Sequence, residues 1–522
     1  MNRTMAQRLF WITVLGIACI FVLLPLLRPG RLVTDDGDWM IIRLSAFYQS
    51  FREGQFPVRF LGRLNNSYGY PVSNFVYPGF LYMGSILHAI GLPFQSVLEI
   101  IIVGSVASGA IALFLWLRYF FDDRASVLGV ASFIFMPYFL YDVFKRGSIG
   151  EILAMSTALV VVYAIESRQI WLLSPAVAFL ALSHNTLAMF FIPILFGYLM
   201  VKRYWDLVIP FIFGVGMSAF FWLPVFFERH MVVFNSVVVS DPTAYFSVSH
   251  TILIRSLPFL IAALIGMFIS IKSKAFRKER WYFFILLFAS AIVTSEVSTA
   301  IWKNQSVAKV IQFPYRLFAL WCFAGPWWIA KLAHTQKSLS LLFLSLSFVF
   351  LFIVVSLPYQ KAETVVKPEE FFTTNESTTT TANEFMPKWI NTIPTQHAPL
   401  RFEFSKGNAT ITERRVRTDK IDITVFAQEE SVLQVNTIYY PGWGAMLDNK
   451  PITISYDNPM GVMRVVIPAG NHQLYMAFRE TKKRFLADIV SCIFIVLFII
   501  LYIVPQSVKK TKALFIQKKR HV

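Results

Sequence analysis

Long apolar runs separated by short polar loops occupy most of the 522 residues of this chain. A helix that crosses a bilayer needs about 20 consecutive, mainly apolar residues. Such runs predict spanning helices at 9–27, 96–118, 126–143, 151–166, 170–182, 187–201, 206–227, 251–271, 281–297, 309–330, 339–357 and 485–504. The run 78–92 is short and interrupted by Gly79, Gly84 and Gly91, so we expect it to lie in the interface or to re-enter.

The basic loops test this assignment, because cytoplasmic loops of membrane proteins are enriched in Lys and Arg. With twelve spans, every internal basic loop and the tail at 509–520 fall on the same side as the N-terminus. We therefore predict an inner-membrane protein with both termini in the cytoplasm, an uncleaved first anchor, and a first outer loop at 28–95. That loop carries six arginines between Arg28 and Tyr77, which is unusual for an outer loop and indicates that some of them have a function.

The segment 358–483 has a different pattern, with fourteen basic and fourteen acidic residues. It opens with the low-complexity stretch Thr373–Thr381, which we read as a linker. Alternating apolar and polar residues then predict strands at 421–425, 431–435, 452–456 and 463–467. We expect an extracytoplasmic β-sandwich-like domain here, between a transmembrane domain at 1–357 and a final helix with a basic tail at 484–522.

Composition supports the membrane assignment and narrows the function. The chain is 56% hydrophobic and only 15% charged, which exceeds what a soluble core can bury. Its net charge of +18 reports the cytoplasmic loops rather than a nucleic-acid partner. The three cysteines lie within apolar runs and indicate neither a disulfide framework nor a thiolate metal site.

The acidic stretch after the first span is the leading candidate for an active site. It places Asp35, Asp36 and Asp38 beside a membrane boundary in a chain with few charges. A solvated loop is the alternative, although Gly37 and Trp39 also indicate shape and membrane-surface packing.

The predicted topology puts further polar residues on the same side, at or near span ends. They include Arg43, Arg59, Tyr70, Tyr77, Arg146, Glu151, His184, Asn185 and Arg316. Ionisable residues at membrane depth persist mainly where they pair or line a cavity. Each also has a simpler explanation: Glu151 could favour a helix N-terminus, His184 could be a satisfied core imidazole, and Arg316 could extend to the surface.

A shared site of these residues would suit transfer of a sugar from a lipid-linked phosphate. Arginines bind phosphate oxygens with two parallel hydrogen bonds, and Arg43, Arg59, Arg146 and Arg316 are the candidates. A carboxylate can act as general base on an acceptor hydroxyl, or hold a divalent cation such as Mg²⁺ or Mn²⁺; Asp36 and Asp38 are the candidate ligands. Tyr70 and Tyr77 could stack on lipid or sugar faces, and His184 and Asn185 could bind substrate.

Several motifs resemble those of a known family. They are Asp36 with Arg43, Gly54–Arg59, Tyr68–Pro71, Tyr77–Pro78, Arg146–Glu151, Ser183–Asn185, Gln312–Arg316, Tyr440–Trp443 and Pro468–His472. In their order they resemble the multi-span membrane glycosyltransferases of GT-C type, and among these the bacterial 6-pyruvoyl-tetrahydropterin-synthase-related membrane proteins. The resemblance implies an outward active site, a polyprenyl-phosphate sugar donor and a catalytic acid in the first outer loop. Related sequences often carry a histidine where this chain has Met40, so a role of that histidine is not carried over.

Together these observations predict an inverting GT-C-type glycosyltransferase that moves a sugar from a polyprenyl-phosphate carrier to an extracytoplasmic acceptor in the cell envelope. Asp36 leads as base, Asp35 and Asp38 assist it, and Glu151 is the second acid. Two alternatives remain open, a non-catalytic assembly protein with the same fold and a lipid or polysaccharide transporter. A transporter should show midplane charges and an inverted repeat, and we find neither in the sequence.

Overall fold

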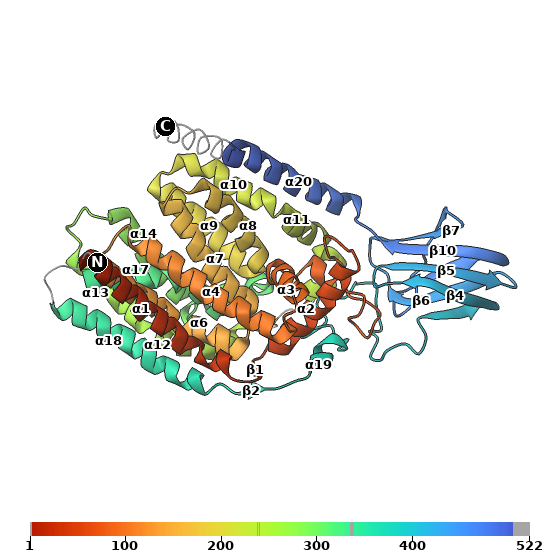
Figure 1. Cartoon of the computed structure of the whole chain (residues 1–522), viewed down its shortest axis with the longest axis horizontal. Helices are drawn as coiled ribbons and strands as arrows, with labels where there is room; N and C mark the ends of the chain where they lie inside the picture. Colours follow the sequence, from red (N-terminus) through yellow and green to blue (C-terminus); the bar gives the residue numbers. More distant parts are fainter. Residues whose placement is uncertain (1–2, 237–238, 240, 335–338, 505–522) are drawn as a thin grey trace, which may run out of the picture.

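The computed structural model describes residues 3–236, 239, 241–334 and 339–504, so the predicted basic tail at 509–520 lies outside the described residues. An elongated helical body carries a β-rich region at one end (Figure 1). The helices are α1 (Arg3–Leu23), α2 (Gly37–Arg52), α3 (Gly79–Ala89), α4 (Phe94–Leu117), α5 (Asp123–Ile134), α6 (Pro137–Tyr141), α7 (Ile149–Glu166), α8 (Ile170–Ser183), α9 (Asn185–Lys202), α10 (Val208–Met217), α11 (Ala219–Glu228), α12 (Phe246–Arg255), α13 (Leu257–Ile269), α14 (Arg277–Val293), α15 (Thr299–Trp302), α16 (Gln305–Ile311), α17 (Trp321–His334), α18 (Leu339–Ser356), α19 (Glu369–Thr373) and α20 (Lys482–Phe498).

The helical body is that of a multi-pass membrane protein, but the predicted count of about twelve spans is not confirmed. Among the described residues, seven helical segments are long and apolar enough to cross a membrane, or ten if each of three bent pairs is one span. Two predicted spans account for the difference. Helix α8 has only 14 residues, and the run 309–330 is divided among α16, the 3-10 turn Pro314–Leu320 and α17. The backbone at Gln312, with φ of 66°, ends α16 before the span could continue.

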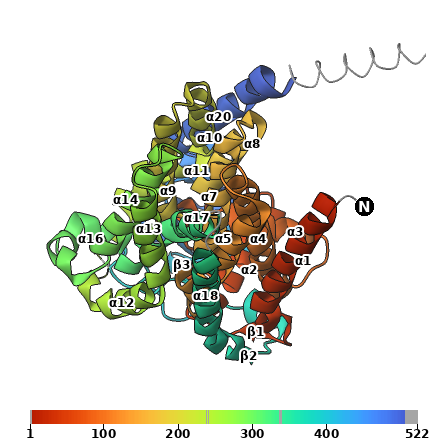
Figure 2. The ribbon, with the colours of Figure 1, turned by 90° about the vertical axis from the view of Figure 1, so that its left-hand side faces the viewer.

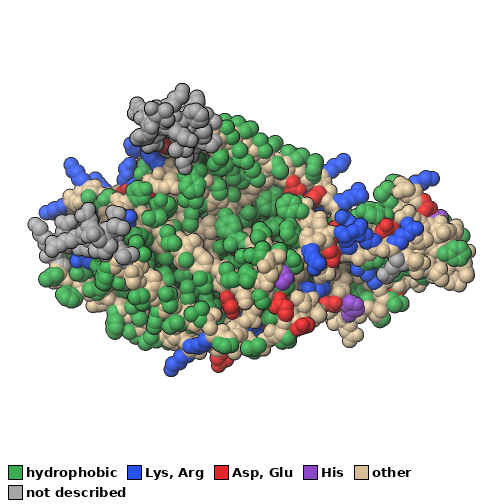
Figure 3. Space-filling model, in the orientation of Figure 1, with side chains coloured by type: hydrophobic (Ala, Val, Ile, Leu, Met, Phe, Trp, Pro, Cys, Tyr) green, Lys and Arg blue, Asp and Glu red, His purple; other side chains and the backbone are tan. Residues whose placement is uncertain are grey.

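The surface of the helical body is divided into an apolar middle and two charged ends. Hydrophobic side chains cover its middle, whereas Lys and Arg gather at the end away from the β-rich region and around the neck of that region (Figure 3). An apolar band between two charged ends is typical of a protein embedded in a bilayer. Helix α1 begins, and α20 ends, at the end away from the β-rich region (Figure 1).

Helix α7 forms the centre of the body and packs against α4 and α8. A Cβ added to Gly109 of α4 would lie 3.0 Å from Oγ of Ser156 in α7. Small residues at such a contact allow two membrane helices to approach closely. This packing holds the first turn of α7, which contains Glu151, inside the body.

The β-rich region consists of two antiparallel sheets, in line with the sequence pattern. Its strands are β3 (Phe402–Lys406), β4 (Ala409–Val416), β5 (Lys420–Ala427), β6 (Ser431–Ile438), β7 (Trp443–Leu447), β8 (Lys450–Ile452), β9 (Val462–Ile467) and β10 (Gly470–Phe478). The order is β4-β5-β10-β7-β8 in one sheet and β3-β6-β9 in the other. Strand β5 buries alternate residues, as its sequence predicts. The run 452–456 differs from the prediction, because β8 ends at Ile452.

The segment after α1 pairs with the segment after α18, although the two lie far apart in the chain. Strand β1 (Arg31–Leu32) pairs with β2 (Thr364–Val365) near the ends of α1 and α18 (Figures 1 and 2). The predicted loop 28–95 contains α2 and α3, and α3 has only 11 residues, too few to cross a bilayer. Residues 357–400, which we call the strap, run from α18 to the β-rich region; within it α19 packs on α2.

Candidate active site

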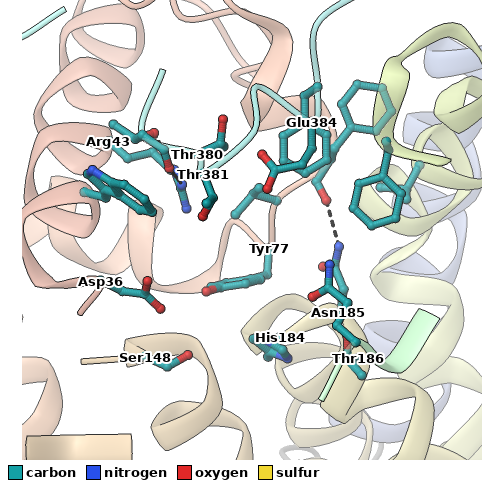
Figure 4. A pocket seen from close by; sticks show the side chains of 18 of the residues that line it. Asp36, Arg43, Tyr77, Ser148, His184, Asn185, Thr186, Thr380, Thr381 and Glu384 are labelled. Atoms are coloured by element: carbon teal, nitrogen blue, oxygen red, sulfur yellow. Dashed lines mark hydrogen bonds between the residues drawn. The ribbon is translucent and has the colours of Figure 1, made fainter. Parts of the chain in front are cut away.

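A polar cavity of about 280 Å³ lies where α2, the loop before α3, the segment before α7, the α8–α9 junction and the strap meet (Figure 4). Of the twelve residues that the sequence marked as a site, seven line it: Asp36, Arg43, Tyr77, Arg146, His184, Asn185 and Arg316. They come from five segments of the chain, and the first and last of them, Asp36 and Arg316, are 280 positions apart. The fold therefore brings most of the predicted residues to one place.

Asp36 is placed by backbone contacts and leaves its carboxylate free to face the cavity. It is the N-cap residue of α2, but its side chain makes no capping hydrogen bond. Its backbone N–H donates to the carbonyl of Arg146 over 2.8 Å, and that of Asp35 donates to the carbonyl of Lys145 over 2.9 Å. Burial raises the pKa of the Asp36 carboxyl, while the positive charges of Arg146 and Arg43 lower it in part. A carboxylate with a raised pKa is better suited to accept a proton.

Gly147 allows the acidic loop to lie against the segment before α7. Its φ is 67°, and a Cβ there would lie 2.2 Å from Oγ1 of Thr34. Any larger residue would push Thr34, and with it Asp36, away from Arg146. The glycine is thus required by both backbone conformation and close approach.

Glu151 lies behind the cavity wall rather than in it, and it is fully buried. Its Oε1 is 2.5 Å from Nη1 of Arg146 and 3.0 Å from Nε of Arg316. The hydroxyl of Tyr138 donates to its other oxygen. Two arginines and a tyrosine therefore occupy the carboxylate, and Glu151 orients Arg146 and Arg316 at the cavity surface instead of facing it.

His184 stands at the junction of α8 and α9. Its Nδ1 accepts a hydrogen bond from the backbone N–H of Leu187 over 3.2 Å and so caps α9. Its Nε2 is 3.7 Å from Oε1 of Glu151. Burial lowers the pKa of His184 to about 3, which keeps the ring neutral. His184 thus caps α9 and also lines the cavity.

Arg43 connects α2 to the strap. Its Nε donates to Oγ1 of Thr379 over 3.1 Å, and its Nη2 donates to the carbonyl of the same residue. Thr379, Thr380 and Thr381 all line the cavity. The low-complexity stretch that we read as a linker therefore forms one wall of the site. Apolar patterning did not reveal this wall, because it is held by hydroxyls and backbone carbonyls.

The other predicted residues do not line the cavity. Asp35 is half exposed and pairs with the exposed Lys145 over 3.0 Å. Asp38 pairs with Arg31 over 2.5 Å and with Lys367 over 2.9 Å.

Arg59 and Tyr70 also make other contacts. Arg59 binds Glu480 and Asp488, each over 2.9 Å, and ties the region before η2 (Pro71–Asn74) to α20. The hydroxyl of Tyr70 lies 3.1 Å from Oγ1 of Thr380 and accepts from the backbone N–H of Phe385 over 2.9 Å. It supports the strap from behind.

The donor set does not fit the divalent cation expected at Asp36 and Asp38. Asp38 is committed to two cations, and Asp36 has Arg146 within 3.9 Å. Over residues 3–236, 239, 241–334 and 339–504, no group of three or more His, Cys, Asp or Glu could hold a metal. The described residues around Asp36 and Asp38 therefore do not form a site for Mg²⁺ or Mn²⁺.

Three further charged residues line the cavity that the sequence did not select as catalytic or substrate-binding candidates. Glu384, on the strap, is a second carboxylate in the wall, and its Oε2 is buried with no hydrogen-bond partner in the described part of the chain. Figure 4 shows it across the cavity from Asp36 and His184. Arg229, after α11, and Lys309, in α16, complete the set. The sequence signal was weak, because each is a single charge, near the end of a short helical segment for Arg229 and Lys309 and in an irregular segment for Glu384.

An apolar groove of about 900 Å³ adjoins the polar cavity between α9 and α11. Its wall includes Ala188, Ile192, Phe221 and Phe226. Six residues line both spaces: Asn185, Met189, Val225, Arg229, Lys309 and Val310. The site therefore combines a polar chamber with an apolar extension on candidate membrane spans.

No family model and no curated protein matches this chain, so the family suggested by its motifs is not shown. Among solved structures it is similar to the arabinofuranosyltransferase AftD from Mycobacteria, with a TM-score of 0.42 and 15% identity over 67% of this chain and 26% of that one. It is also similar to the oligosaccharyltransferase of Archaeoglobus fulgidus, with a TM-score of 0.41 and 11% identity over 70% of this chain and 55% of that one. The chain thus spans about a quarter and just over half of the lengths of these two proteins.

Proposed function

We propose that this protein is a membrane glycosyltransferase that moves a sugar from a polyprenyl-phosphate donor to an acceptor on the extracytoplasmic side of the membrane, in the cell envelope. One observation carries the proposal: Asp36 faces a polar cavity that shares a wall with an apolar groove. A substrate with a sugar head and a hydrocarbon tail matches such a pair of spaces. The polar chamber would take the sugar and the acceptor, and the groove would take the start of the lipid.

Asp36 is the base in this reaction. It removes the proton from an acceptor hydroxyl as that oxygen forms a bond to the anomeric carbon of the sugar. The bond between this carbon and the phosphate oxygen breaks, and its electron pair leaves with the phosphate. Attack from the face opposite the phosphate inverts the anomeric configuration. Asp36 suits the role because its ion pair with Arg146 is long, at 3.9 Å, and Arg146 is itself paired to Glu151.

The other residues of the cavity position substrate. Arg43 holds the strap through Thr379, so that Thr380 and Thr381 present hydroxyls to the chamber. Asn185 donates to the carbonyl of Phe75 over 2.7 Å, while its Oδ1 is buried and has no partner among the described residues. That oxygen is available to accept a hydrogen bond from a sugar hydroxyl.

A non-catalytic assembly protein is the competing function. Such a protein would need no free carboxylate in a cavity, because the shape of its fold alone would suffice. The convergence of Asp36 and Arg316 on one cavity favours the enzyme.

The test uses membranes that contain the protein and a set of labelled polyprenyl-phosphate sugars. We expect transfer of label from the lipid to the polymer fraction, and a loss of about 100-fold or more in Asp36→Asn at unchanged membrane abundance. Asp206→Asn is the matched control, because Asp206 is exposed and pairs only loosely, over 3.7 Å, with Arg168. Glu384→Gln tests the second carboxylate. Full transfer by Asp36→Asn would exclude Asp36 as the base.

A further inference from the structure

We propose that Arg229 and Lys309 bind the phosphate of the lipid-linked donor at the junction of the polar cavity and the apolar groove. The assignment rests on the proposed function for the identity of the ligand. It differs from the sequence analysis, which gave this role to Arg43, Arg59, Arg146 and Arg316.

The position of the two residues is the first reason. Arg229 lies in the 3-10 turn Arg229–Met231 that follows α11, and Lys309 lies in α16. They are the two basic residues that line both the polar cavity and the apolar groove. A phosphate placed between them would have its hydrocarbon chain in the groove and its sugar in the chamber with Asp36.

The commitments of the other arginines are the second reason. Arg146 and Arg316 both bind Glu151. Arg59 binds Glu480 and Asp488, and Arg43 binds Thr379. A phosphate would have to compete with these partners for donors that are already used.

Arg229 and Lys309 are free of such partners. In the part of the chain that the structure describes, neither forms an ion pair with a carboxylate, whereas the arginines around Glu151 do. The guanidinium of Arg229 lies over the ring of Phe234, 5.0 Å from its centroid. Its Nε is buried and has no hydrogen-bond partner among the described residues. A buried hydrogen-bond donor without a partner destabilises the folded protein, and an oxygen of a bound ligand would provide that partner.

The groove decides which kind of phosphate is bound. Its wall is mainly apolar, with Ile192, Pro193, Phe221 and Trp222 among its residues. The groove lies on candidate membrane spans, and a hydrocarbon chain can fill it, whereas a free phosphate or a nucleotide has no apolar chain to place there. We therefore assign the pair to a phosphate carried on a hydrocarbon chain.

The test measures binding of a probe that carries no sugar, so that it does not depend on transfer. The purified full-length protein in nanodiscs is titrated with undecaprenyl phosphate and, in parallel, with undecaprenol. We expect wild type to bind the phosphate about tenfold or more tightly than the alcohol, because charged groups strengthen such hydrogen bonds. In Arg229→Gln/Lys309→Gln this ratio should fall to near one, while affinity for the alcohol stays the same.

Control variants separate this effect from misfolding and from bulk charge. Arg229→Lys and Lys309→Arg keep the charges and should keep most of the preference. Lys303→Gln removes one charge from the exposed end of α15, six positions before Lys309, and should leave the ratio unchanged. Thermal unfolding of each variant checks the fold.

Three results would overturn the assignment. They are an unchanged ratio in the double variant, no preference for phosphate in wild type, and equal competition by phosphatidylglycerol, which would make the pair a site for bulk anionic lipid. Asp36→Asn should bind undecaprenyl phosphate like wild type. Loss of the proposed function would therefore appear in the transfer assay, and loss of the phosphate assignment in the binding assay.

Discussion

Glu151 and Arg316 form a buried ion pair, with Oε1 of the acid 3.0 Å from Nε of the arginine, although 165 positions separate them in the chain. The pair joins the first turn of α7 to the 3-10 turn Pro314–Leu320. Arg146 binds the same oxygen, and its Nη2 is 3.9 Å from Oδ2 of Asp36. One carboxylate thus sets the positions of two cations in the cavity wall.

The first prediction follows from this burial. Glu151→Ala leaves Arg146 and Arg316 without their shared counter-ion inside the body, which should cost about 3–5 kcal/mol of stability. We expect a large drop in the thermal unfolding temperature in detergent and low abundance in membranes. Glu296→Gln, at an exposed acid in the turn after α14, should change neither. A Glu151→Ala protein as stable as wild type would show that the two arginines do not depend on this acid.

The second prediction concerns the pH dependence of transfer. Burial raises the pKa of Asp36 above its ordinary value of 3.8, and a base must be deprotonated to act. Transfer should therefore rise with pH and reach its plateau above the raised pKa, rather than near the value of a free aspartate. A rate profile measured at saturating donor checks this. A profile that is flat down to the pH at which a free aspartate titrates would contradict it.

The third prediction concerns the stability of the same residue. The pKa of Asp36 is raised in the folded protein, so folding favours the protonated carboxyl. Its contribution to the free energy of unfolding is therefore complete below the unfolded pKa and is lost as the pH rises through the folded pKa. At neutral pH the ionised carboxylate is thus a cost to the fold. Asp36→Asn should be at least as stable as wild type at pH 7 while it is inactive in transfer. Thermal unfolding of both proteins at pH 7 and at a pH near the ordinary value of 3.8 tests the sign, and an Asn variant that is clearly less stable at pH 7 would argue for a structural role.

The fourth prediction compares a glycine in crowded surroundings, Gly147, with one in open space, Gly104. In Gly147→Ala the left-handed backbone alone costs about 1–2 kcal/mol, and the new Cβ would meet Thr34 at 2.2 Å. We expect lower stability and a loss of transfer, because Asp36 moves with Thr34. Gly104→Ala, in α4, has nothing within 4 Å of its new Cβ and should be neutral or stabilising by about 0.5–1 kcal/mol. Equal effects of the two substitutions would contradict the proposed placement of the acidic loop.

Local pattern alone indicated many of the elements and candidate residues for the site. The apolar runs predicted helices, and the alternation in 421–467 predicted β5, β6 and β9, because burial of one face repeats with the period of the element. The short run 78–92 is not among the candidate spans, because α3 has only 11 residues. Asp36 was selected from the sequence because a carboxylate at a membrane boundary is costly unless it pairs or lines a cavity.

The tertiary structure decided the partners of the charged residues. Arg316 pairs with Glu151, Arg59 with Glu480 and Arg43 with Thr379, each more than 100 positions away in the chain, and contacts of this kind leave no periodic signal. Within the strap, the stretch Thr373–Thr381 was read as a linker because its threonines have no apolar pattern, yet Arg43 binds Thr379. Glu384, which follows this stretch, stands in the cavity wall. Bends within and between helices likewise depend on the packing around them, which is why the described residues hold seven candidate spans, or ten if each bent pair is one span, instead of twelve. The sequence by itself determined the apolar segments and the acidic loop, while only the folded chain determined which helices are bent or broken and which charges remain free for a ligand.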